Sequence, residues 1–446
     1  MLVTGLGLVT PLGCSANANW KAMIAGHRAG RSLTREDIDH FDHLSAIEGL
    51  VLHGAAVDYA VVARRLEFSK LLETVPAGIA TAWRSEPMVA MSLVAFAEAM
   101  SHAGLRCHDL EPERTAIVFG SSKGGLRSTE RMAEALAARH TRKPQLATMG
   151  TGYDTEERFS QPAFQLQKDS VDLWNCGVQP DSATRAIAAL TGATVASSCP
   201  VAACATGLIA FLQGAAMIHR GECDVCVVGS ADAGLRSSVL ASFHRLRVTS
   251  RHCDAATACR PFDKSRDGFV VGEGAGVAVL ESRAHARFRR AKSIARVLAG
   301  GWLNDPTGMT QVDESGAVVS EVLKRTLTLH GMRPDILSLH GTGTESNDLA
   351  EARGIQMAFG AAMPQCFGMK GAIGHLLGAA GSVETVLTLL ALHHQQVPGT
   401  TNLTSVDERC RMPLQPQARR MPHMQKAAKL SLGFGGHVAC GVFERD

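Results

Sequence analysis

The chain has 446 residues, of which 46% are hydrophobic and 20% are charged. This composition is typical of a globular protein that buries a large core, and it excludes disordered, collagen-like and coiled-coil chains. Lysine and arginine exceed aspartate and glutamate by only three, 45 against 42, so the charge is too balanced for a general nucleic-acid-binding protein.

The first residues, MLVTGLGLVTPLG (1–13), lack the basic region and the long apolar region of a secretory signal peptide. The 12 cysteines are scattered rather than regularly paired, which is typical of free thiols in a reducing compartment. We therefore expect a cytoplasmic protein.

Apolar strands and helix-length segments alternate along the chain. The predicted strands are residues 115–119, 194–197, 225–228, 277–280, 336–339 and 429–432, and the predicted helices are residues 206–220, 348–359 and 376–394. This alternation predicts an α/β protein with buried strands. A basic stretch at residues 283–296 is interpreted as a solvated helix face that joins the two halves of the chain.

Two segments need separate interpretations. The segment 186–218 contains no charged residue and is long enough to span a bilayer as a helix. Glycine, proline and hydroxyl residues interrupt it, so we expect a strand, a tight turn and a buried helix, and no membrane span. Residues 127–181 are polar and show no clear period, which favours a loop-rich surface insertion.

The segment around Cys204 is the most informative for chemistry. Small residues surround this cysteine, and an apolar helix follows it. A thiol at a helix N-terminus faces the positive end of the helix dipole and unpaired N–H groups, which can lower its pKa and stabilise an oxyanion. The sequence therefore predicts a nucleophile, with a small buried core residue as the alternative interpretation.

A histidine follows the predicted strand 336–339, and a Gly/Thr turn follows the histidine. We expect His340 at the rim of the sheet, where α/β proteins bind ligands. Thr342 and Thr344 offer hydroxyl groups beside it that suit an amide-bearing substrate arm. A buried histidine with structural hydrogen bonds only is the alternative.

Lys370 and His375 lie five residues apart in an otherwise small and apolar segment. A lysine buried there needs a partner, and Glu384 is the candidate. The nearby glycines do not form the GxxxxGK[ST] pattern of a phosphate-binding loop. Farther along, three glycines flank Phe434, a pattern that suits either a bulky gate on mobile backbone or a turn with a core phenylalanine.

Together these motifs resemble one known family. The chain is similar to the β-ketoacyl-acyl carrier protein synthase II family of the thiolase-like superfamily, over residues 1–126 and 182–446. The most specific motifs are VTGLGLVTPLG (3–13), CRPFDKSRDGFVVGEGAG (259–276), HGTGT (340–344), KGAIGHLLGAAG (370–381) and GFGG (433–436).

The resemblance implies a duplicated five-layer αβαβα fold and a homodimer whose active site lies near the interface. It divides the chain into two halves. Residues 1–286 would form an N-terminal half that carries the nucleophile and a divergent insertion at 127–181. Residues 287–446 would form a C-terminal half that carries the two histidines.

The implied reaction is a decarboxylative Claisen condensation. Cys204 would accept an acyl chain from acyl carrier protein, and His340 and His375 would support decarboxylation of a malonyl thioester through hydrogen bonds to its carbonyl. The phosphopantetheine arm of the malonyl carrier would contact Thr342 and Thr344. No metal or redox cofactor is implied, because the malonyl carboxylate leaves as CO₂.

The resemblance also assigns supporting roles. Lys370 and Glu384 would form the charged pair that orders the site. The backbone N–H groups of Cys204 and Phe434 would form the oxyanion hole, and Phe434, next to Gly433, would be the gate.

Some positions depart from the family pattern. Ala202 stands where the family usually has threonine, Gly368 and Met369 stand where Ser-Thr is common, and His437 stands where threonine is typical. With the unmatched segment 127–181, these departures favour a specialised lipid or polyketide-type pathway as an alternative to fatty-acid biosynthesis.

Two further hypotheses concern partners. A non-catalytic subunit, like the chain-length factors that pair with ketosynthases, is the alternative function, but such subunits lack the nucleophile that Cys204 would provide. We also expect a basic rim for the acidic carrier protein, formed by Arg245, Arg247, Arg251 and Arg260.

Overall fold

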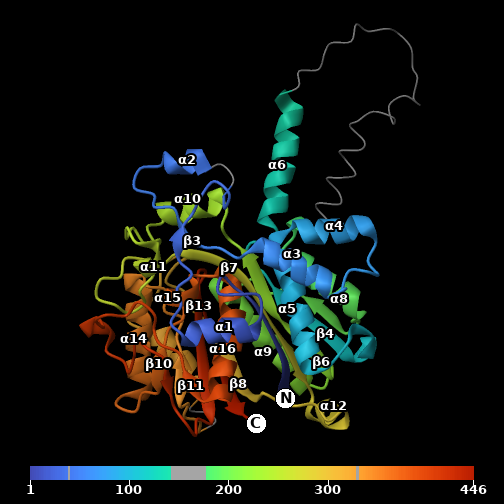
Figure 1. The fold of residues 1–446 in the computed structure, drawn as a ribbon. Coiled ribbons are helices and arrows are strands. Elements are labelled where there is room, and N and C mark those ends of the chain that lie inside the picture. Colours follow the sequence, from blue (N-terminus) through green and yellow to red (C-terminus); the bar gives the residue numbers. More distant parts are fainter. Residues whose placement is uncertain (39–40, 142–176, 328–330) are drawn as a thin grey trace.

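The computed structural model describes residues 1–38, 41–141, 177–327 and 331–446. One large sheet dominates it and contains two groups of five strands (Figure 1). The N-terminal group runs β5 (Ala196–Ser198), β4 (Thr115–Gly120), β6 (Val225–Ala233), β7 (Val271–Glu281) and β1 (Leu2–Val9). The C-terminal group runs β10 (Gln365–Phe367), β9 (Ile336–Ser338), β13 (Lys426–Gly433), β14 (His437–Arg445) and β8 (Ala295–Asn304).

The two groups have the same internal order and the same strand directions. In each group three parallel strands are followed by two antiparallel ones. A short pairing of Leu2 with Arg296 and of Val3 with Ala295 joins β1 to β8 and so joins the groups. The strands β4, β5 and β6 therefore correspond to β9, β10 and β13, and the fold is the duplicated α/β architecture that was predicted.

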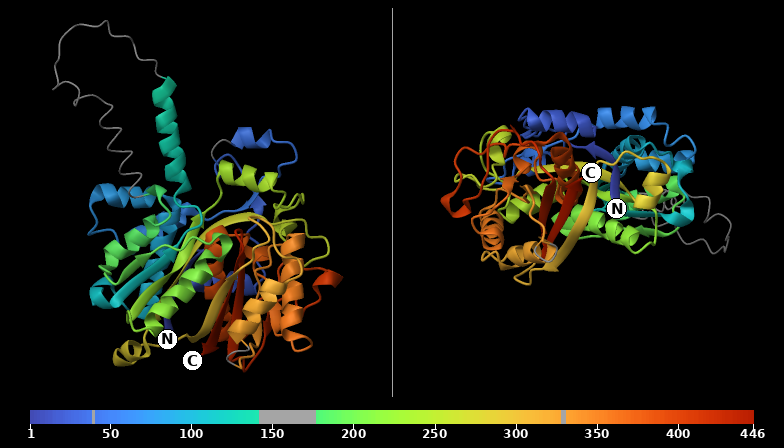
Figure 2. Two further views of the ribbon diagram at one scale, coloured as in Figure 1. Left: turned by 180° about the vertical axis from the view of Figure 1, so that it is seen from behind. Right: turned by 90° about the horizontal axis from the view of Figure 1, so that it is seen from below.

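Helices form the other layers. The outer face of the N-terminal group is covered by α5 (Pro87–Ala103) and α8 (Ser182–Thr191), and that of the C-terminal group by α13 (Ala317–Leu327) and α14 (Glu345–Phe359). Between the groups lie α9 (Thr206–His219) and α16 (Ala380–His394), as Figure 2 also shows. The order of the layers is therefore αβαβα.

The two central helices touch through glycines near their N-termini. A Cβ atom on Gly207 would lie 2.2 Å from the Ser382 nitrogen, and one on Gly381 would lie 2.5 Å from the Leu208 nitrogen. Any larger residue at either position would push the helices apart. This contact brings the N-termini of α9 and α16 together in the middle of the molecule.

The remaining elements lie around this core. The helices are α1 (Ala16–Ile24), α2 (Phe41–Ser45), α3 (Tyr59–Phe68), α4 (Ala77–Ser85), α6 (Leu126–Thr141), α10 (Ser237–Arg245), α11 (Ala255–Ala258), α12 (Arg283–Phe288) and α15 (Lys370–Ile373). The short strands β2 (Arg31–Ser32) and β3 (His53–Ala55) extend from β7, and β11 (Gln396–Val397) pairs with β12 (Arg419–Arg420).

The predicted strands and helices are confirmed, with different bounds. The strands β6 and β7 are longer than predicted, and all of their residues are buried. The helix α14 begins three residues earlier, at Glu345, and α16 begins four residues later, at Ala380, because residues 377–379 form a 3₁₀ turn. The division of the chain at residues 286 and 287 stays a prediction.

One prediction for 127–181 is wrong. Residues 126–141 form the helix α6 rather than loops (Figure 1). This stretch is rich in strong helix formers, which include alanine, glutamate, arginine, leucine and methionine. An ion pair between Glu130 and Arg236 ties the helix to the body of the protein. Residues 142–176 of the predicted insertion lie outside the described residues.

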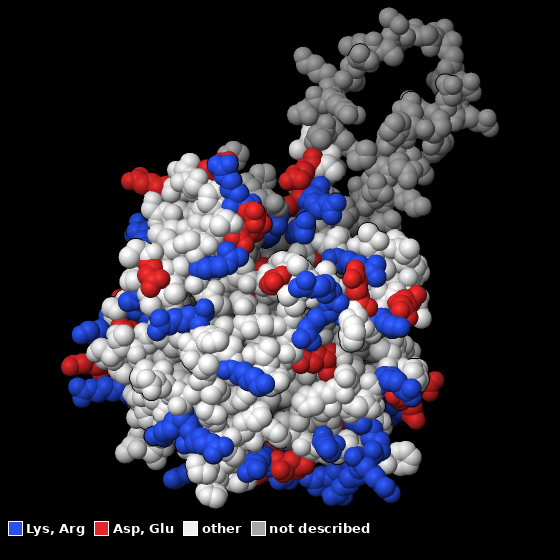
Figure 3. Space-filling view, in the orientation of Figure 1, with Lys and Arg blue, Asp and Glu red and all other residues white. Residues whose placement is uncertain are grey.

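The uncharged segment 186–218 folds as predicted into the end of α8, the strand β5, a turn and the buried helix α9. No helix in the described part of the chain has the length and the apolar character needed to cross a membrane. In the basic stretch, Arg283, Arg287 and Arg290 are exposed on or beside α12, where basic side chains gather at the lower right of Figure 3.

Candidate active site

Four loops converge on one cavity. They follow the strand β5 of the N-terminal group and the strands β9, β10 and β13 of the C-terminal group. The cavity has a volume of about 820 Å³, and its lining includes Cys204, His340, His375, Thr342, Thr344, Gly433 and Phe434. The structure therefore brings together most of the predicted site residues, with Lys370 and Glu384 buried behind them.

The chain turns sharply at the predicted nucleophile. Ala203 has a φ of 46°, which is the left-handed region that residues other than glycine rarely adopt. Residues 203–205 form a 3₁₀ turn that leads into α9. Cys204 is half-buried and faces the cavity. Gly433 packs against this turn, since a Cβ atom there would lie 2.7 Å from the Ala202 oxygen and 3.1 Å from the Cys204 nitrogen.

The expectation of a lowered thiol pKa is wrong. Burial raises the pKa of the Cys204 thiol to about 11, although the ammonium groups of Lys370 and Lys123 oppose this shift. Removing water disfavours the thiolate more than these charges favour it. The thiol of the free protein is therefore protonated at neutral pH.

His340 follows β9 and is held by its backbone and its ring. The backbone N–H groups of His340 and Gly341 donate to the buried carboxylate of Glu351, at 2.5 and 2.8 Å. The ammonium of Lys370 lies 3.3 Å from Nδ1 of His340. Because an ammonium can only donate, Nδ1 is the acceptor and Nε2 carries the proton.

His375 adopts the same tautomer through a different contact. The backbone N–H of Leu377 donates to Nδ1 of His375 at 3.1 Å, which leaves the proton on Nε2. Burial lowers the pKa of both imidazoles well below 6.5, and the charge of Lys370 lowers them further. Both rings are therefore neutral N–H donors at pH 7. Their centroids are 5.6 Å apart in an edge-to-face arrangement.

The predicted ion pair is present and has a third member. Lys370 lies 2.7 Å from one carboxylate oxygen of Glu384, and Lys429 lies 2.8 Å from the other. All three side chains are buried. Sequence reasoning missed Lys429, because a lysine in a strand is usually exposed; the strongly apolar surroundings in β13 were the available signal. Glu351 was also missed as the residue that holds the His340 loop.

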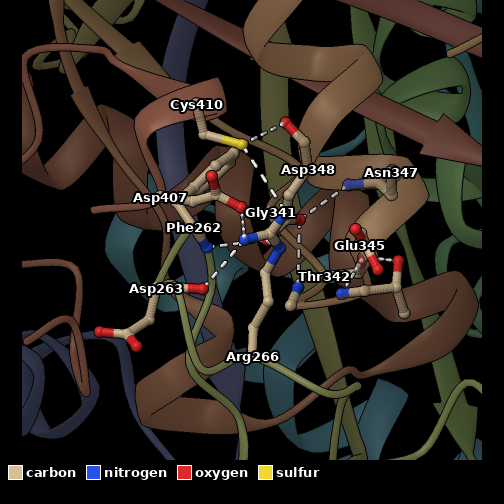
Figure 4. Close-up of polar contacts among 12 residues, drawn as sticks. Phe262, Asp263, Arg266, Gly341, Thr342, Glu345, Asn347, Asp348, Asp407 and Cys410 are labelled. Atoms are coloured by element: carbon tan, nitrogen blue, oxygen red, sulfur yellow. Dashed lines mark hydrogen bonds and ion pairs between the residues drawn. The ribbon is translucent and has the colours of Figure 1, made fainter. Parts of the chain in front are cut away.

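A second buried network holds the Gly/Thr turn (Figure 4). The carboxylate of Asp348 accepts from the backbone N–H groups of Gly343 and Phe262, at 3.1 and 2.7 Å. Arg266 lies 3.5 Å from the same carboxylate. Within the turn the hydroxyl oxygens of Thr342 and Thr344 are 2.8 Å apart and line the cavity.

The turn around Phe434 completes the cavity wall. Gly435 and Gly436 have φ values of 85° and 84°, and the N–H of Gly435 donates to the Met309 oxygen at 2.7 Å. Among the residues that the structure describes, no backbone oxygen accepts from the N–H groups of Cys204 or Phe434. These two donors are available to a charged oxygen in the cavity.

One group of described residues could hold a metal ion. The sulfur of Cys204 and a ring nitrogen from each of His340 and His375 lie within 4.8 Å of one another. Thiolate and imidazole are ligands that Zn²⁺ prefers. A bound ion would therefore lie among these three side chains.

Known proteins share this fold and this sequence pattern. The N-terminal domain model of the beta-ketoacyl synthases matches residues 1–286, and their C-terminal domain model matches residues 294–404. The chain is 30% identical over 453 residues to the 3-oxoacyl-[acyl-carrier-protein] synthase 2 of Vibrio cholerae, covering 100% of this chain and 99% of that protein. It is 35% identical over 271 residues to the corresponding Mycobacterium bovis synthase, covering 60% of this chain and 65% of that protein.

Solved structures agree on the fold. A type II polyketide ketosynthase in complex with its acyl-carrier protein is 24% identical with a TM-score of 0.80, covering 100% of this chain and 99% of the other. A beta-ketoacyl synthase from Burkholderia phymatum, also 24% identical, has a TM-score of 0.76 over 100% of this chain and 99% of the other. The fold is thus that of the thiolase-like condensing enzymes. Within this class, the chain belongs to the beta-ketoacyl synthase family.

Proposed function

We propose that this protein is a β-ketoacyl-acyl carrier protein synthase, an acyltransferase of fatty-acid or specialised lipid or polyketide-type biosynthesis. The observation that carries the proposal is the convergence of the Cys204 sulfur with two neutral histidines in one cavity. A thiol supplies the nucleophile of acyl transfer, and neutral N–H donors stabilise an enolate without protonating it.

In the first step Cys204 attacks the carbonyl carbon of an acyl thioester on acyl carrier protein. The oxygen takes the negative charge and receives hydrogen bonds from the N–H groups of Cys204 and Phe434. The bond to the phosphopantetheine sulfur then breaks. The thiol proton of Cys204 goes to that sulfur, and the acyl chain stays on the protein.

In the second step a malonyl thioester enters along Thr342 and Thr344. The bond between its carboxylate and C2 breaks, CO₂ leaves, and the electron pair forms an enolate whose oxygen accepts from Nε2 of His340 and of His375. C2 then attacks the acyl carbonyl carbon and expels the Cys204 thiolate, which takes a proton from solvent. The product is a 3-oxoacyl thioester, and residues of this chain supply the nucleophile and the hydrogen-bond donors.

Buried charges support these groups. Lys370, held by Glu384, donates to Nδ1 of His340 and so keeps the proton of that ring on the side of the substrate. Phe434 lies on a turn with two left-handed glycines beside Gly433, which suits a side chain that moves aside for the acyl chain. The alternative function, a chain-length-factor-like partner, requires no such arrangement around a nucleophile.

The partners follow from the surface. Three exposed arginines lie near the cavity mouth, which Arg247 lines: Arg245, Arg247 and Arg251. Their positive charge would attract the acidic carrier protein.

The strand β5 forms an edge of the sheet close to Cys204, and Val201 beside it is 56% exposed. We propose that this edge pairs with a second copy in a homodimer. The described cysteines are free, which suits a cytoplasmic protein.

The test is the intact mass of the protein after incubation with acyl-acyl carrier protein, followed by peptide mapping. The proposal expects one acyl adduct on the Cys204 peptide, absent from Cys204→Ala. Addition of malonyl-acyl carrier protein should discharge the adduct and yield 3-oxoacyl-acyl carrier protein and CO₂. An unmodified protein with every acyl length would contradict the proposal and favour the non-catalytic partner.

A further inference from the structure

The loop that follows β4 is the counterpart, in the N-terminal half, of the loop that carries His340. It contains Ser121, Ser122 and Lys123. The buried carboxylate of Asp232 fixes it, because it accepts from the Ser121 hydroxyl at 2.6 Å and from the Ser122 N–H at 3.1 Å. The same carboxylate accepts from the Gly378 N–H at 2.7 Å. The loop is therefore tied to the turn that follows His375.

This loop also packs against the turn that carries the nucleophile. A Cβ atom on Gly120 would lie 2.3 Å from the Thr206 methyl group and 2.6 Å from the Pro200 oxygen. Thr206 is the first residue of α9, two residues after Cys204. The residues that follow Gly120 thus lie beside the thiol, at the end of the sheet where the reaction would occur.

Lys123 places a positive charge on the loop that follows β4. Its ammonium lies 5.8 Å from the centre of the Phe243 ring, which lines the cavity. Phe243 packs edge-to-face on Phe269 at 5.5 Å, and Phe269 packs on His375 at 4.8 Å. Burial raises the pKa of Cys204, and among the charges that oppose this shift are Lys370 and then Lys123. The ammonium is thus close enough to the sulfur to influence it.

In the described residues the ammonium of the half-buried Lys123 has no hydrogen-bond or ion-pair partner, although its charge acts at longer range on the buried carboxylate of Asp232. No carboxylate lies within 4.0 Å of the ammonium, and no oxygen or nitrogen in the part of the chain that the structure describes forms a hydrogen bond with it. A half-buried lysine whose ammonium contacts an aromatic ring and has no acceptor among the described residues retains its donors for a ligand.

The reaction determines which substrate group meets Lys123. The malonyl arm must reach the acyl-Cys204 intermediate through the mouth lined by Thr342 and Thr344, while the acyl chain is already attached. The acyl chain must therefore leave that path free and extend on the other side of the sulfur. The Ser121–Lys123 loop is not among the residues that line the cavity, and Gly120 at its start packs against the turn that carries Cys204. It is therefore available to an acyl chain that extends away from the mouth.

We propose that Lys123 is a specificity-determining residue that selects acyl chains with an acceptor oxygen near the thioester, such as a keto oxygen or a carboxylate. This inference rests on the proposed function. An alkyl chain would remove water from the ammonium without replacing its hydrogen bonds, which costs free energy. A keto oxygen or a carboxylate would replace them, and the carboxylate would add an ion pair. A 3-oxoacyl chain is itself the product of the condensation, so its acceptance would permit another round of elongation.

The test compares rates of Cys204 acylation, followed by intact mass, for three thioesters of acyl carrier protein: octanoyl, 3-oxo-octanoyl and 3-carboxyoctanoyl, which differ only in the group on C3. The wild type should prefer at least one of the oxygenated chains over octanoyl by about tenfold or more. Lys123→Met, which keeps the length of the side chain without the charge, should remove or reverse this preference. Lys123→Arg should retain it, and the exposed control Lys21→Met should behave as the wild type does.

The outcomes separate the two proposals. If the ratio of oxygenated to plain chain is the same in the wild type and in Lys123→Met, the inference about Lys123 is wrong although the enzyme is active. Selection of the carboxylate alone would identify an ion pair, and selection of the 3-oxo chain as well would identify a hydrogen bond to a neutral oxygen. If no chain acylates Cys204 in the wild type, the proposed function itself fails. Should Lys123→Met not fold, the comparison of Lys123→Arg with Lys123→Gln decides in the same way.

Discussion

The two halves of this protein place different chemistry at corresponding strand ends. In the N-terminal half the loop after β5 carries Cys204 into the cavity, and the loop after β4 carries Lys123, which contacts the lining residue Phe243. In the C-terminal half the loops after β9 and β10 carry His340 and His375 into the same cavity. The duplicated sheet fixes where the four loops meet, and the loop residues determine what each contributes. The duplication has thus built one site from two unlike halves, which in the proposed reaction serve acyl transfer and decarboxylation.

The halves also differ in how their loops are held. The nucleophile turn rests on close backbone packing, since Gly433 leaves no room for a side chain beside Cys204. The histidine loops rest on buried charges, chiefly Lys370, Glu384 and Glu351. A steric change should therefore damage the first half of the reaction, and a change of charge should damage the second.

The largest expected effect is on decarboxylation. His340→Ala or His375→Ala removes one of two donors to the enolate oxygen and should lower the rate of CO₂ release from malonyl-acyl carrier protein by about 10²–10³-fold. Acylation of Cys204 should change far less, and His340→Gln, which keeps an N–H near the position of Nε2, should recover part of the rate. Equal losses of both half-reactions would show that the halves do not act separately.

The second prediction concerns stability. Glu384→Gln leaves two buried lysines without a counter-charge and should lower the free energy of unfolding by about 3–5 kcal/mol. Lys429→Met leaves Glu384 paired with Lys370 at 2.7 Å, so the loss should be smaller, about 1–3 kcal/mol. Denaturant unfolding of both variants measures the difference. A larger loss in Lys429→Met would contradict the central place of Glu384.

The third prediction compares two glycines at corresponding strand ends. Gly433, the last residue of β13, faces backbone atoms of the Cys204 turn. Gly234, just after β6, faces the Leu377 side chain, 2.4 Å from an added Cβ, and the nearest backbone atom, the Gly272 oxygen, is 3.4 Å away. Gly433→Ala should slow acylation of Cys204 by up to about 10²-fold because it displaces the nucleophile. Gly234→Ala should cost less, since a leucine side chain can rotate. Acylation rates that fall equally would refute the distinction.

The smallest effect is the pH dependence of thiol alkylation. Because burial raises the pKa of Cys204 to about 11, the thiolate fraction and the rate of reaction with iodoacetamide should rise about tenfold per pH unit from pH 7 to pH 10. Peptide mapping would follow the Cys204 peptide alone. A plateau near pH 7 would instead indicate a thiolate stabilised by the helix N-terminus.

The reacting groups could be predicted from sequence motifs. Their protonation could not, because it depends on burial, which the sequence does not show. Cys204, His340 and His375 stand in motifs that resemble those of one known family, so their convergence could be anticipated. The direction of the thiol pKa could not, because helix position and burial act in opposite directions and only the structure shows which is larger. Lys429 was missed for a similar reason, since a single lysine in a strand does not reveal its tertiary neighbours. The helix α6 was missed for another reason, because its polar composition concealed a run of strong helix formers.

The most direct test of separable halves is CO₂ release from malonyl-acyl carrier protein by Cys204→Ala. The variant lacks the nucleophile but keeps both neutral histidines and the buried charges behind them. It should form no acyl adduct and no 3-oxoacyl product, yet it should release CO₂ at a rate at least as high as that of the wild type without acyl donor. Loss of CO₂ release together with acylation would contradict the assignment of the two steps to different halves.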